Sequence, residues 1–270
     1  MYLSKKRAIN LNNPIVSVLI ANYNNQKFIR DCVESIKNQT YKNIEIIFHD
    51  DFSSDNSIKI ISKYKKIKVI KNKIRTKYGA FNQMNAYQRA FQKSKGKIIF
   101  LLDSDDFFSK KKIKIIVNYL KRNQKISSIF DLPIIKYKKN LKLMKNKKKI
   151  IHNFWPYIPP QSCIAMRRVD FKKILSKINF KLFPDIWMDF RIALYLKYIE
   201  KNFVIINKNL TYYRQSPDMI SAKFKFLSFS WWRRRMQAHN YVKFFFLKNQ
   251  IKHTNNFDYF LTCFMNYFIR

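Results

Sequence analysis

The sequence predicts an α/β fold with a mainly parallel, doubly wound sheet. Between residues 14 and 122, short apolar runs rich in β-branched residues alternate with segments whose apolar residues recur at helical spacing. This alternation is typical of βαβ units. In addition, the apolar run at residues 98–102 leads directly into aspartates at 103, 105 and 106. Open α/β sheets bind ligands at the carboxyl ends of their strands, so this edge is the first candidate for a functional site.

The expected elements follow in order along the chain, beginning with a strand opened by Pro14. Strands are predicted at residues 15–20, 44–48, 67–71, 98–102 and 204–206. Helices are predicted at residues 28–36, 58–64, 80–91, 113–120 and 184–199, because apolar residues recur there three or four positions apart. The lysine-rich stretch at residues 136–149 is expected to be a solvated surface loop.

Three of the predicted strands end next to polar or aromatic side chains, namely Tyr23, Asp51 and Asp103. Because the strands are parallel, we expect these side chains to meet at one rim of the sheet. The whole chain has two glycines, Gly79 and Gly96. This scarcity excludes the glycine-rich loops of dinucleotide-binding and P-loop proteins.

The aspartates after residue 102 have two interpretations. Like charges this close repel one another, so the cluster is costly unless a cation neutralises it. Oxygen ligands suit Mg²⁺ or Mn²⁺, which proteins usually share with a phosphate. The structural alternative is an acidic turn that caps the helix expected to start near Ser109. The cluster alone leaves both open.

The net charge is extreme, with 55 Lys and Arg against 16 Asp and Glu, or +39. Such a charge fits a nucleic-acid partner, an anionic membrane surface, or a compositional habit of Lys-, Asn- and Ile-rich coding. No nucleic-acid-binding motif is visible, so nucleic acid is the least favoured partner. Cys32, Cys163 and Cys263 are widely spaced, which favours reduced thiols and argues against a zinc site. No apolar run approaches the ~20 residues of a membrane-spanning helix, so we expect a cytoplasmic protein, with peripheral attachment to the inner face of the membrane left open.

Five segments in order resemble the motifs of the family 2 glycosyltransferases, which are inverting nucleotide-sugar enzymes of the GT-A fold. They are Val16 to Asn24, Glu45 to Asp55, the approach from Asn85 through Asp106, Trp187-Met188-Asp189, and Leu210 to Ser221. The resemblance covers residues 14–221. It implies a GT-A-type mixed, mainly parallel sheet flanked by helices. Beyond it, the aromatic and basic residues 224–270 are expected to form a helical C-terminal extension.

The resemblance also implies a domain organisation. Residues 1–13 would be an N-terminal arm and residues 14–223 the glycosyltransferase domain. Within that domain, residues 14–122 would bind the nucleotide sugar and residues 150–223 the acceptor. The C-terminal extension at residues 224–270 would either pack on the catalytic domain or form a basic, aromatic surface for an anionic membrane.

Donor binding would involve residues at the strand ends. Asp51 would accept a hydrogen bond from the imide N–H of uracil or a similar base, and Tyr23 would stack on that base. Arg214 would brace the diphosphate, since guanidinium matches phosphate geometry. The structural alternatives are a helix cap for Asp51, a strand-end aromatic for Tyr23 and a surface charge for Arg214.

The metal would be Mn²⁺ or Mg²⁺. By the resemblance, Asp103 and Asp105 would hold the ribose and the metal side of the diphosphate, and Asp106 is the first candidate for a direct metal ligand beside Asp105. Which of these carboxylates turns inward stays open at this point.

The catalytic base would be Asp189, because inverting transfer needs a carboxylate to take the proton of the acceptor hydroxyl. Asp185 is the alternative base, with helix initiation as its structural role. Trp187 would be a sugar platform or part of the core.

The chain departs from the family pattern in three ways. Ala21-Asn22 replaces the commoner Pro-Thr, and Phe52 stands where glycine is usual after the paired aspartates. The Gln-x-x-Arg-Trp signature of processive synthases is absent, which favours transfer of a single sugar. The resemblance implies a UDP-linked donor and a glycan or lipid-linked acceptor in cell-surface polysaccharide or glycan biosynthesis. The alternatives are a catalytically silent relative and a basic protein that binds polyanions or nucleic acid.

Overall fold

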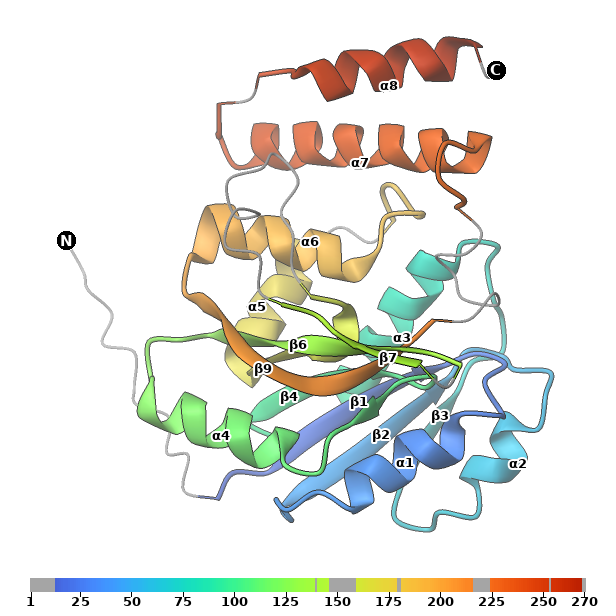
Figure 1. Ribbon diagram of the computed structural model, residues 1–270, viewed down its shortest axis with the longest axis vertical. Coiled ribbons are helices and arrows are strands. Elements are labelled where there is room, and N and C mark those ends of the chain that lie inside the picture. The colour runs from blue at the N-terminus through green and yellow to red at the C-terminus, as the bar shows by residue number, and fades with distance from the viewer. Residues whose placement is uncertain are drawn as a thin grey trace.

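The computed structural model describes residues 13–138, 140–145, 159–178, 181–215, 224–252 and 254–268. Over these ranges the chain forms one mixed sheet with helices on both faces (Figure 1). The predicted arm lies outside the described residues except for Asn13. Parts of the predicted lysine-rich loop and of the predicted acceptor half, residues 146–158 and 216–223, also lie outside them.

The first four strands form the parallel part of the sheet, in the order β3-β2-β1-β4. They are β1 (Val16–Asn22), β2 (Ile44–Asp50), β3 (Lys68–Lys71) and β4 (Ile98–Asp103). The register aligns Ala21 of β1 with His49 of β2 and with Asp103 of β4. The carboxyl ends of β1, β2 and β4 therefore reach the same rim, as the sequence predicts.

The remaining strands extend the sheet beyond β4 and are mostly antiparallel. They are β5 (Phe107–Phe108), β6 (Ser128–Tyr137), β7 (Asn140–Leu143), β8 (Ile164–Arg167) and β9 (Phe203–Arg214). The order continues β4-β8-β6-β9-β5, with β7 paired to β6. β6 and β9 are parallel, while β4 with β8, β8 with β6 and β5 with β9 are antiparallel.

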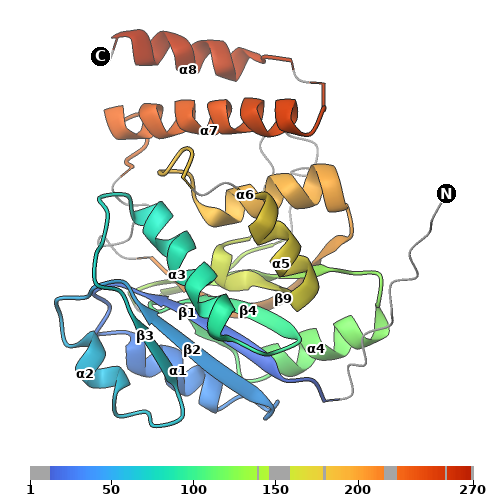
Figure 2. The same ribbon diagram turned by 180° about the vertical axis from the view of Figure 1, so that it is seen from behind.

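Helices cover the two faces of the sheet (Figures 1 and 2). One face carries α1 (Ile29–Lys37), α2 (Ser57–Ile61) and α4 (Lys112–Arg122), and the other carries α3 (Gly79–Lys93), α5 (Arg168–Lys177) and α6 (Met188–Tyr195). Along β1, Val18 packs into the core on the side of α1 and α4, and Leu19 packs into the core on the side of α3 and α6. A strand buried on both faces in this way reads as a continuous apolar run, which explains why its sequence gave a clear signal.

The C-terminal extension is helical, as expected. α7 (Phe229–Lys248) packs above α6, and α8 (Phe257–Phe268) lies on α7 as the outermost layer (Figure 2). Tyr241 and Val242 of α7 are buried in the same core as α6, so α7 packs on the body of the fold. None of the helices in the described ranges combines the length and hydrophobicity that a membrane crossing requires.

Four details of the predicted elements were wrong. The lysine-rich stretch is not simply a loop, because it includes the end of β6 and the exposed strand β7, which pair as a hairpin. The strand at residues 204–206 extends to Arg214. The helix expected from residue 184 begins at Met188, which leaves Asp185 in the preceding turn. β6, β8 and α5 were not predicted.

Candidate active site

A cavity of about 380 Å³ opens at the rim where β1, β2 and β4 end. Its lining includes four of the predicted site residues on the donor side, namely Tyr23, Asp51, Asp103 and Asp105, together with Asp189 from the start of α6. These residues are up to 166 positions apart in sequence (189 − 23). The fold therefore gathers the predicted donor residues and the predicted base in one cavity.

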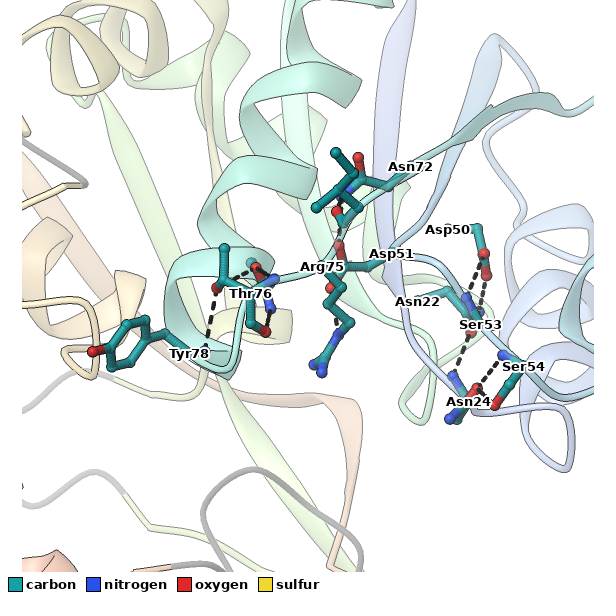
Figure 3. Close-up of polar contacts among 12 residues, drawn as sticks. Asn22, Asn24, Asp50, Asp51, Ser53, Ser54, Asn72, Arg75, Thr76 and Tyr78 are labelled. Atoms are coloured by element: carbon teal, nitrogen blue, oxygen red, sulfur yellow. Dashed lines mark hydrogen bonds and ion pairs between the residues drawn. The ribbon is translucent and has the colours of Figure 1, made fainter.

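One end of the cavity is organised around Asp51, whose side chain is 4% exposed. Arg75 donates from Nε to Asp51 Oδ2 at 2.7 Å, and Asn72 donates from Nδ2 to Asp51 Oδ1 at 2.9 Å (Figure 3). Burial raises the pKa of the Asp51 carboxyl, and the hydrogen bonds from Asn72 and Arg75 oppose that rise. The guanidinium of Arg75 also lies over the Tyr23 ring, 3.4 Å from its centroid. Tyr23, Asp51 and Arg75 thus form one stacked, charged wall.

The turn after β2 is held by side chains from β1. Asn22 donates from Nδ2 to Asp50 Oδ1 at 2.7 Å and to Ser53 Oγ at 3.1 Å, and the Ser53 amide donates to Asp50 Oδ2 at 2.9 Å (Figure 3). Phe52, in the middle of this turn, has φ of 62°. That left-handed region favours glycine, the residue that the resemblance leads one to expect at this position.

The acidic turn after β4 divides its carboxylates between the cavity and the interior. Asp103 accepts hydrogen bonds on Oδ1 from the Tyr87 hydroxyl and from Gln83 Nε2, both at 2.8 Å. Burial, and then repulsion from Asp105, raises the pKa of Asp103 to about 7. Burial also raises the pKa of Asp105, which lines the cavity beside it.

Asp106 points the other way. Its side chain is fully buried, and it accepts hydrogen bonds from Ser162 Oγ at 2.6 Å and from the Arg214 amide at 2.9 Å. Burial, together with repulsion from its two acidic neighbours, holds its pKa well above the usual range. Asp106 does not line the cavity, so of the two residues predicted to bind metal only Asp105 faces it.

Arg214 also lies behind this turn. Its Nη1 donates to the Asp105 carbonyl at 2.6 Å, its Nη2 pairs with Asp31, and its guanidinium packs between the rings of Phe28 and Phe107. It is 7% exposed and does not line the cavity. The structure therefore places Arg214 where it fixes the backbone of Asp105, in contrast to the direct diphosphate contact that the resemblance implies.

A further part of the cavity lining is formed by α6 and its neighbours. Asp189 lies in the first turn of α6, where the Phe190 amide donates to its Oδ1 at 2.8 Å. Burial raises the pKa of Asp189 to about 6, although the Phe190 amide and the charge of Arg234 oppose the rise. Asp185 accepts a hydrogen bond from Gln237 Nε2 at 2.9 Å and does not line the cavity. Of the two candidate bases, only Asp189 faces the cavity.

Comparison with known proteins identifies the family. The sequence model described as "Glycosyl transferase family 2" matches residues 17–179. The chain belongs to glycosyl transferase family 2. A relative from Escherichia coli, the UDP-Glc:alpha-D-GlcNAc-diphosphoundecaprenol beta-1,3-glucosyltransferase WfaP, is 32% identical over 215 residues, which are 78% of this chain and 82% of that protein.

Other family members match over smaller shares of their length. An uncharacterized glycosyltransferase of Haemophilus influenzae is 38% identical over 122 residues, which are 44% of this chain and 36% of that protein. The glycosyltransferase alr2836 of a Nostoc species is 29% identical over 219 residues, which are 74% of this chain and 64% of that protein. The chain thus spans less than two thirds of the length of these two relatives.

Solved structures confirm the GT-A fold. TarS residues 1–349 of S. aureus, solved in complex with UDP-GlcNAc, superposes with a TM-score of 0.64 at 15% identity, covering 93% of this chain and 70% of that one. The mannosyltransferase PcManGT from Pyrobaculum calidifontis, in complex with GDP-Man and Mn²⁺, gives a TM-score of 0.55 at 13% identity, covering 95% and 70%. At these identities the likeness establishes the fold alone, and it confirms the predicted fold class.

Sequence analysis missed several lining residues of this family 2 protein. Arg75, Gln83, Gln161, Tyr213 and Arg234 all line the cavity. Tyr213 has its pKa raised by burial and by nearby aspartates. The position of Tyr213 next to the matched Arg214 could have suggested a role. Arg75 and Arg234 had no such signal, because both are embedded in strongly basic stretches.

The residues present suit a divalent cation that is shared with a ligand. Within the described ranges, no group of three or more His, Cys, Asp or Glu side chains is arranged to hold a metal alone. Mg²⁺-type sites usually need one or two carboxylates plus substrate phosphates. Asp103 and Asp105 supply the carboxylates. Burial raises both pKa values, and a bound cation would favour the ionised forms.

Proposed function

We propose that this protein transfers a single sugar from a nucleotide-sugar donor to a hydroxyl of a glycan or lipid-linked acceptor, with inversion and with Mn²⁺ or Mg²⁺, in cell-surface polysaccharide or glycan biosynthesis. The observation that carries the proposal is the shared cavity of Asp51, Asp105 and Asp189. It unites a nucleobase acceptor group, a cation ligand and a proton acceptor. UDP is the proposed donor nucleotide because the E. coli relative is named for UDP-Glc and the TarS structure holds UDP-GlcNAc.

The donor would bind along the strand ends. Asp51 accepts a hydrogen bond from the base while Tyr23 and Arg75 form the wall beside it. Asp105, with Asp103 beside it, would hold the cation, which neutralises negative charge that develops on the leaving diphosphate. Ser162 and Arg214 fix the acidic turn from behind, since they bond to Asp106 and to the Asp105 carbonyl. The turn is thereby positioned before any ligand arrives.

The acceptor would enter from the α6 side. Asp189, with a pKa of about 6, is largely ionised at neutral pH and takes the proton of the acceptor hydroxyl. The hydroxyl oxygen forms a bond to the anomeric carbon as the bond from that carbon to the diphosphate oxygen breaks, so the configuration inverts. The nucleoside diphosphate leaves with the electron pair.

A donor panel tests the proposal. UDP-, GDP- and dTDP-sugars are added with and without Mn²⁺, and the melting temperature is measured. We expect a UDP-sugar to stabilise the protein only when Mn²⁺ is present, and Asp105→Asn to abolish that stabilisation. Glu34→Gln, which changes a carboxylate that pairs with Lys37 on α1 outside the cavity lining, is the control and should retain it. Binding of RNA at 0.2 M salt without a response to any nucleotide sugar would instead favour the polyanion-binding alternative.

Peripheral attachment to the inner, anionic face of the membrane is part of the same proposal. α8 exposes Phe257 (81%), Phe260 (59%), Phe264 (59%) and Phe268 (67%), and their spacing of three or four residues places them on one side of the helix. α8 is the outermost layer of the molecule (Figure 1). Aromatic side chains of this kind insert at the membrane interface, and the net charge of +39 complements anionic lipid.

Vesicle co-sedimentation tests the attachment. On phosphatidylserine vesicles, Phe260→Ser/Phe264→Ser should reduce the bound fraction at least ~threefold, since each ring contributes buried apolar area. Leu141→Ser/Leu143→Ser on β7 is the matched control, because these side chains are similarly exposed, at 59% and 62%. Equal loss in both double variants would argue against α8 as the membrane contact.

A further inference from the structure

α7 contributes one cation to the cavity, Arg234. The family match ends at residue 179, so this side chain comes from the extension that follows it. Its guanidinium carbon lies 4.0 Å from the ring centroid of Trp187 and 4.0 Å from that of Phe224, and its Nε donates to the Asp185 carbonyl at 3.1 Å. Two aromatic contacts and a backbone hydrogen bond hold the guanidinium in a defined orientation at the edge of the cavity.

The two cations of the described cavity lining differ in their pairing. Arg75 forms an ion pair with Asp51 at 2.7 Å. Arg234 has no carboxylate within 4.0 Å in the described part of the chain. Burial lowers the pKa of Arg234 to about 10, with Asp189 and Asp185 opposing the change, so the side chain stays charged at neutral pH. A partly desolvated guanidinium with N–H groups on a cavity is a strong site for an oxyanion.

The location of Arg234 indicates which substrate supplies that oxyanion. Trp187 and Asp189 also line this end of the cavity, and the charge of Arg234 lowers the pKa of Asp189, so the guanidinium lies on the side of the proposed base. Tyr23, Asp51 and Arg75 form the wall proposed to hold the donor nucleotide. An anion at Arg234 therefore lies next to the acceptor hydroxyl.

We infer that Arg234 binds a phosphate of the acceptor, so that the acceptor is a sugar carried on a diphosphate-linked lipid. This inference rests on the proposed transfer reaction and narrows its acceptor class. The guanidinium fork can donate two parallel hydrogen bonds to a phosphate. The acceptor in the printed name of the E. coli relative, a GlcNAc-diphosphoundecaprenol, belongs to this chemical class.

An equilibrium experiment tests the inference without knowledge of the sugar. The protein is first loaded with UDP and Mn²⁺, which occupy the donor half, and is then titrated with farnesyl diphosphate or with farnesol. We expect the diphosphate to bind at least tenfold more tightly than the alcohol, and Arg234→Gln to reduce that preference to less than ~twofold, the loss expected for a charge-assisted hydrogen bond. No preference in the unmodified protein, or a preference that survives in the variant, would overturn the inference.

A second titration separates the two sources of phosphate. UDP is titrated with Mn²⁺ in the absence of any lipid. The inference predicts that Arg234→Gln changes UDP affinity by less than ~twofold, whereas a tenfold loss would assign Arg234 to the donor diphosphate and overturn the acceptor role. Failure of UDP to bind the unmodified protein would count against the proposed function, and the lipid titration can then be read without UDP.

Two variants control for structure. Arg233→Gln removes the neighbouring charge, whose side chain is 58% exposed and absent from the cavity lining, and should leave the diphosphate preference unchanged. Arg234→Lys keeps the charge without the planar fork, so an intermediate preference is expected. Melting temperatures of all variants identify any loss of folding.

Discussion

The two proposed halves of the cavity are built differently. The donor half is lined by Tyr23, Asp51, Arg75, Asp103 and Asp105, and the acceptor half by Trp187, Asp189, Tyr213 and Arg234. In the donor half, Asp51 accepts hydrogen bonds from Asn72 and Arg75, and Asp103 accepts them from Gln83 and Tyr87. In the acceptor half, Asp189 accepts one from the amide of the next residue. Side chains from several elements thus hold the carboxylates of the donor half, whereas a backbone amide of its own helix holds Asp189.

This difference follows from how each half is encoded. The donor half comes from consecutive βα units between residues 16 and 103, in which parallel strands place their ends side by side. The acceptor half combines α6, the end of β9 and α7, which follow one another in sequence but do not form repeated βα units.

The largest effect on activity is expected for Asp189→Asn in the acceptor half. Loss of the general base should reduce kcat ~10²–10⁴-fold, while UDP binding with Mn²⁺ stays unchanged because the donor half is intact. Asp185→Asn is the matched control, since that carboxylate contacts Gln237 outside the cavity lining, and it should keep nearly full activity. Equal losses in the two variants would show that Asp189 is not the base.

The pH dependence sharpens the same test. The base must be ionised, and its pKa is about 6, so kcat/KM should rise with pH through about 6 and level off above it. The charged or titratable groups that influence this carboxyl are Arg234, Asp103 and Tyr213. Because the charge of Arg234 lowers the pKa of Asp189, Arg234→Gln should move the rising limb to higher pH. If kcat/KM of Arg234→Gln rises over the same pH range as in the unmodified protein, the two side chains are not coupled.

The next largest effect is expected behind the donor half, at a buried ion pair. Lys112 and Asp131 are both fully buried and 2.8 Å apart, and Lys112 Nζ also donates to the Ser162 carbonyl at 2.7 Å. Ser162 in turn bonds to Asp106 and accepts from the Asp103 amide. The pair therefore supports the acidic turn through one intervening residue.

Lys112→Met should destabilise the protein by about 3–5 kcal/mol, because it leaves Asp131 buried without its cation. Lys112→Met/Asp131→Leu removes both charges and should recover most of that loss. Chemical denaturation measures both values. A double variant as unstable as the single one would mean that the ion pair contributes more than mutual neutralisation.

This ion pair also explains part of what the sequence could not predict. β6 contains Asp131 and Pro133, two residues that disfavour a central strand by pattern. Asp131 is tolerated because Lys112, at the start of the preceding helix α4, reaches it. β8 has four residues, too few for a periodic signal. By contrast, β1 and β4 are continuous apolar runs buried on both faces, and their local sequence is sufficient.

The same limit applies within the acidic turn. The sequence placed Asp103, Asp105 and Asp106 at the correct strand end, but their side-chain directions depend on distant partners. Ser162 and the Arg214 amide hold Asp106 inward, and both belong to segments that follow it by 50 residues or more. The role of Arg234 could not be predicted from the sequence either, since it depends on how α7 packs on α6.

The smallest expected effect tests the turn that carries Asp51. Phe52→Gly should stabilise the protein by about 0.5–1 kcal/mol, because relief of the left-handed backbone, worth ~1–2 kcal/mol, exceeds the entropic cost of glycine, ~0.5–1 kcal/mol. The Phe52 side chain is 58% exposed, so little apolar burial is lost. Phe52→Ala is the matched control: it removes the same ring but keeps the Cβ and the strain, and it should give no gain. If denaturation shows equal changes for the two variants, the ring rather than the backbone sets the stability of this turn, and the donor half tolerates phenylalanine there for its contacts.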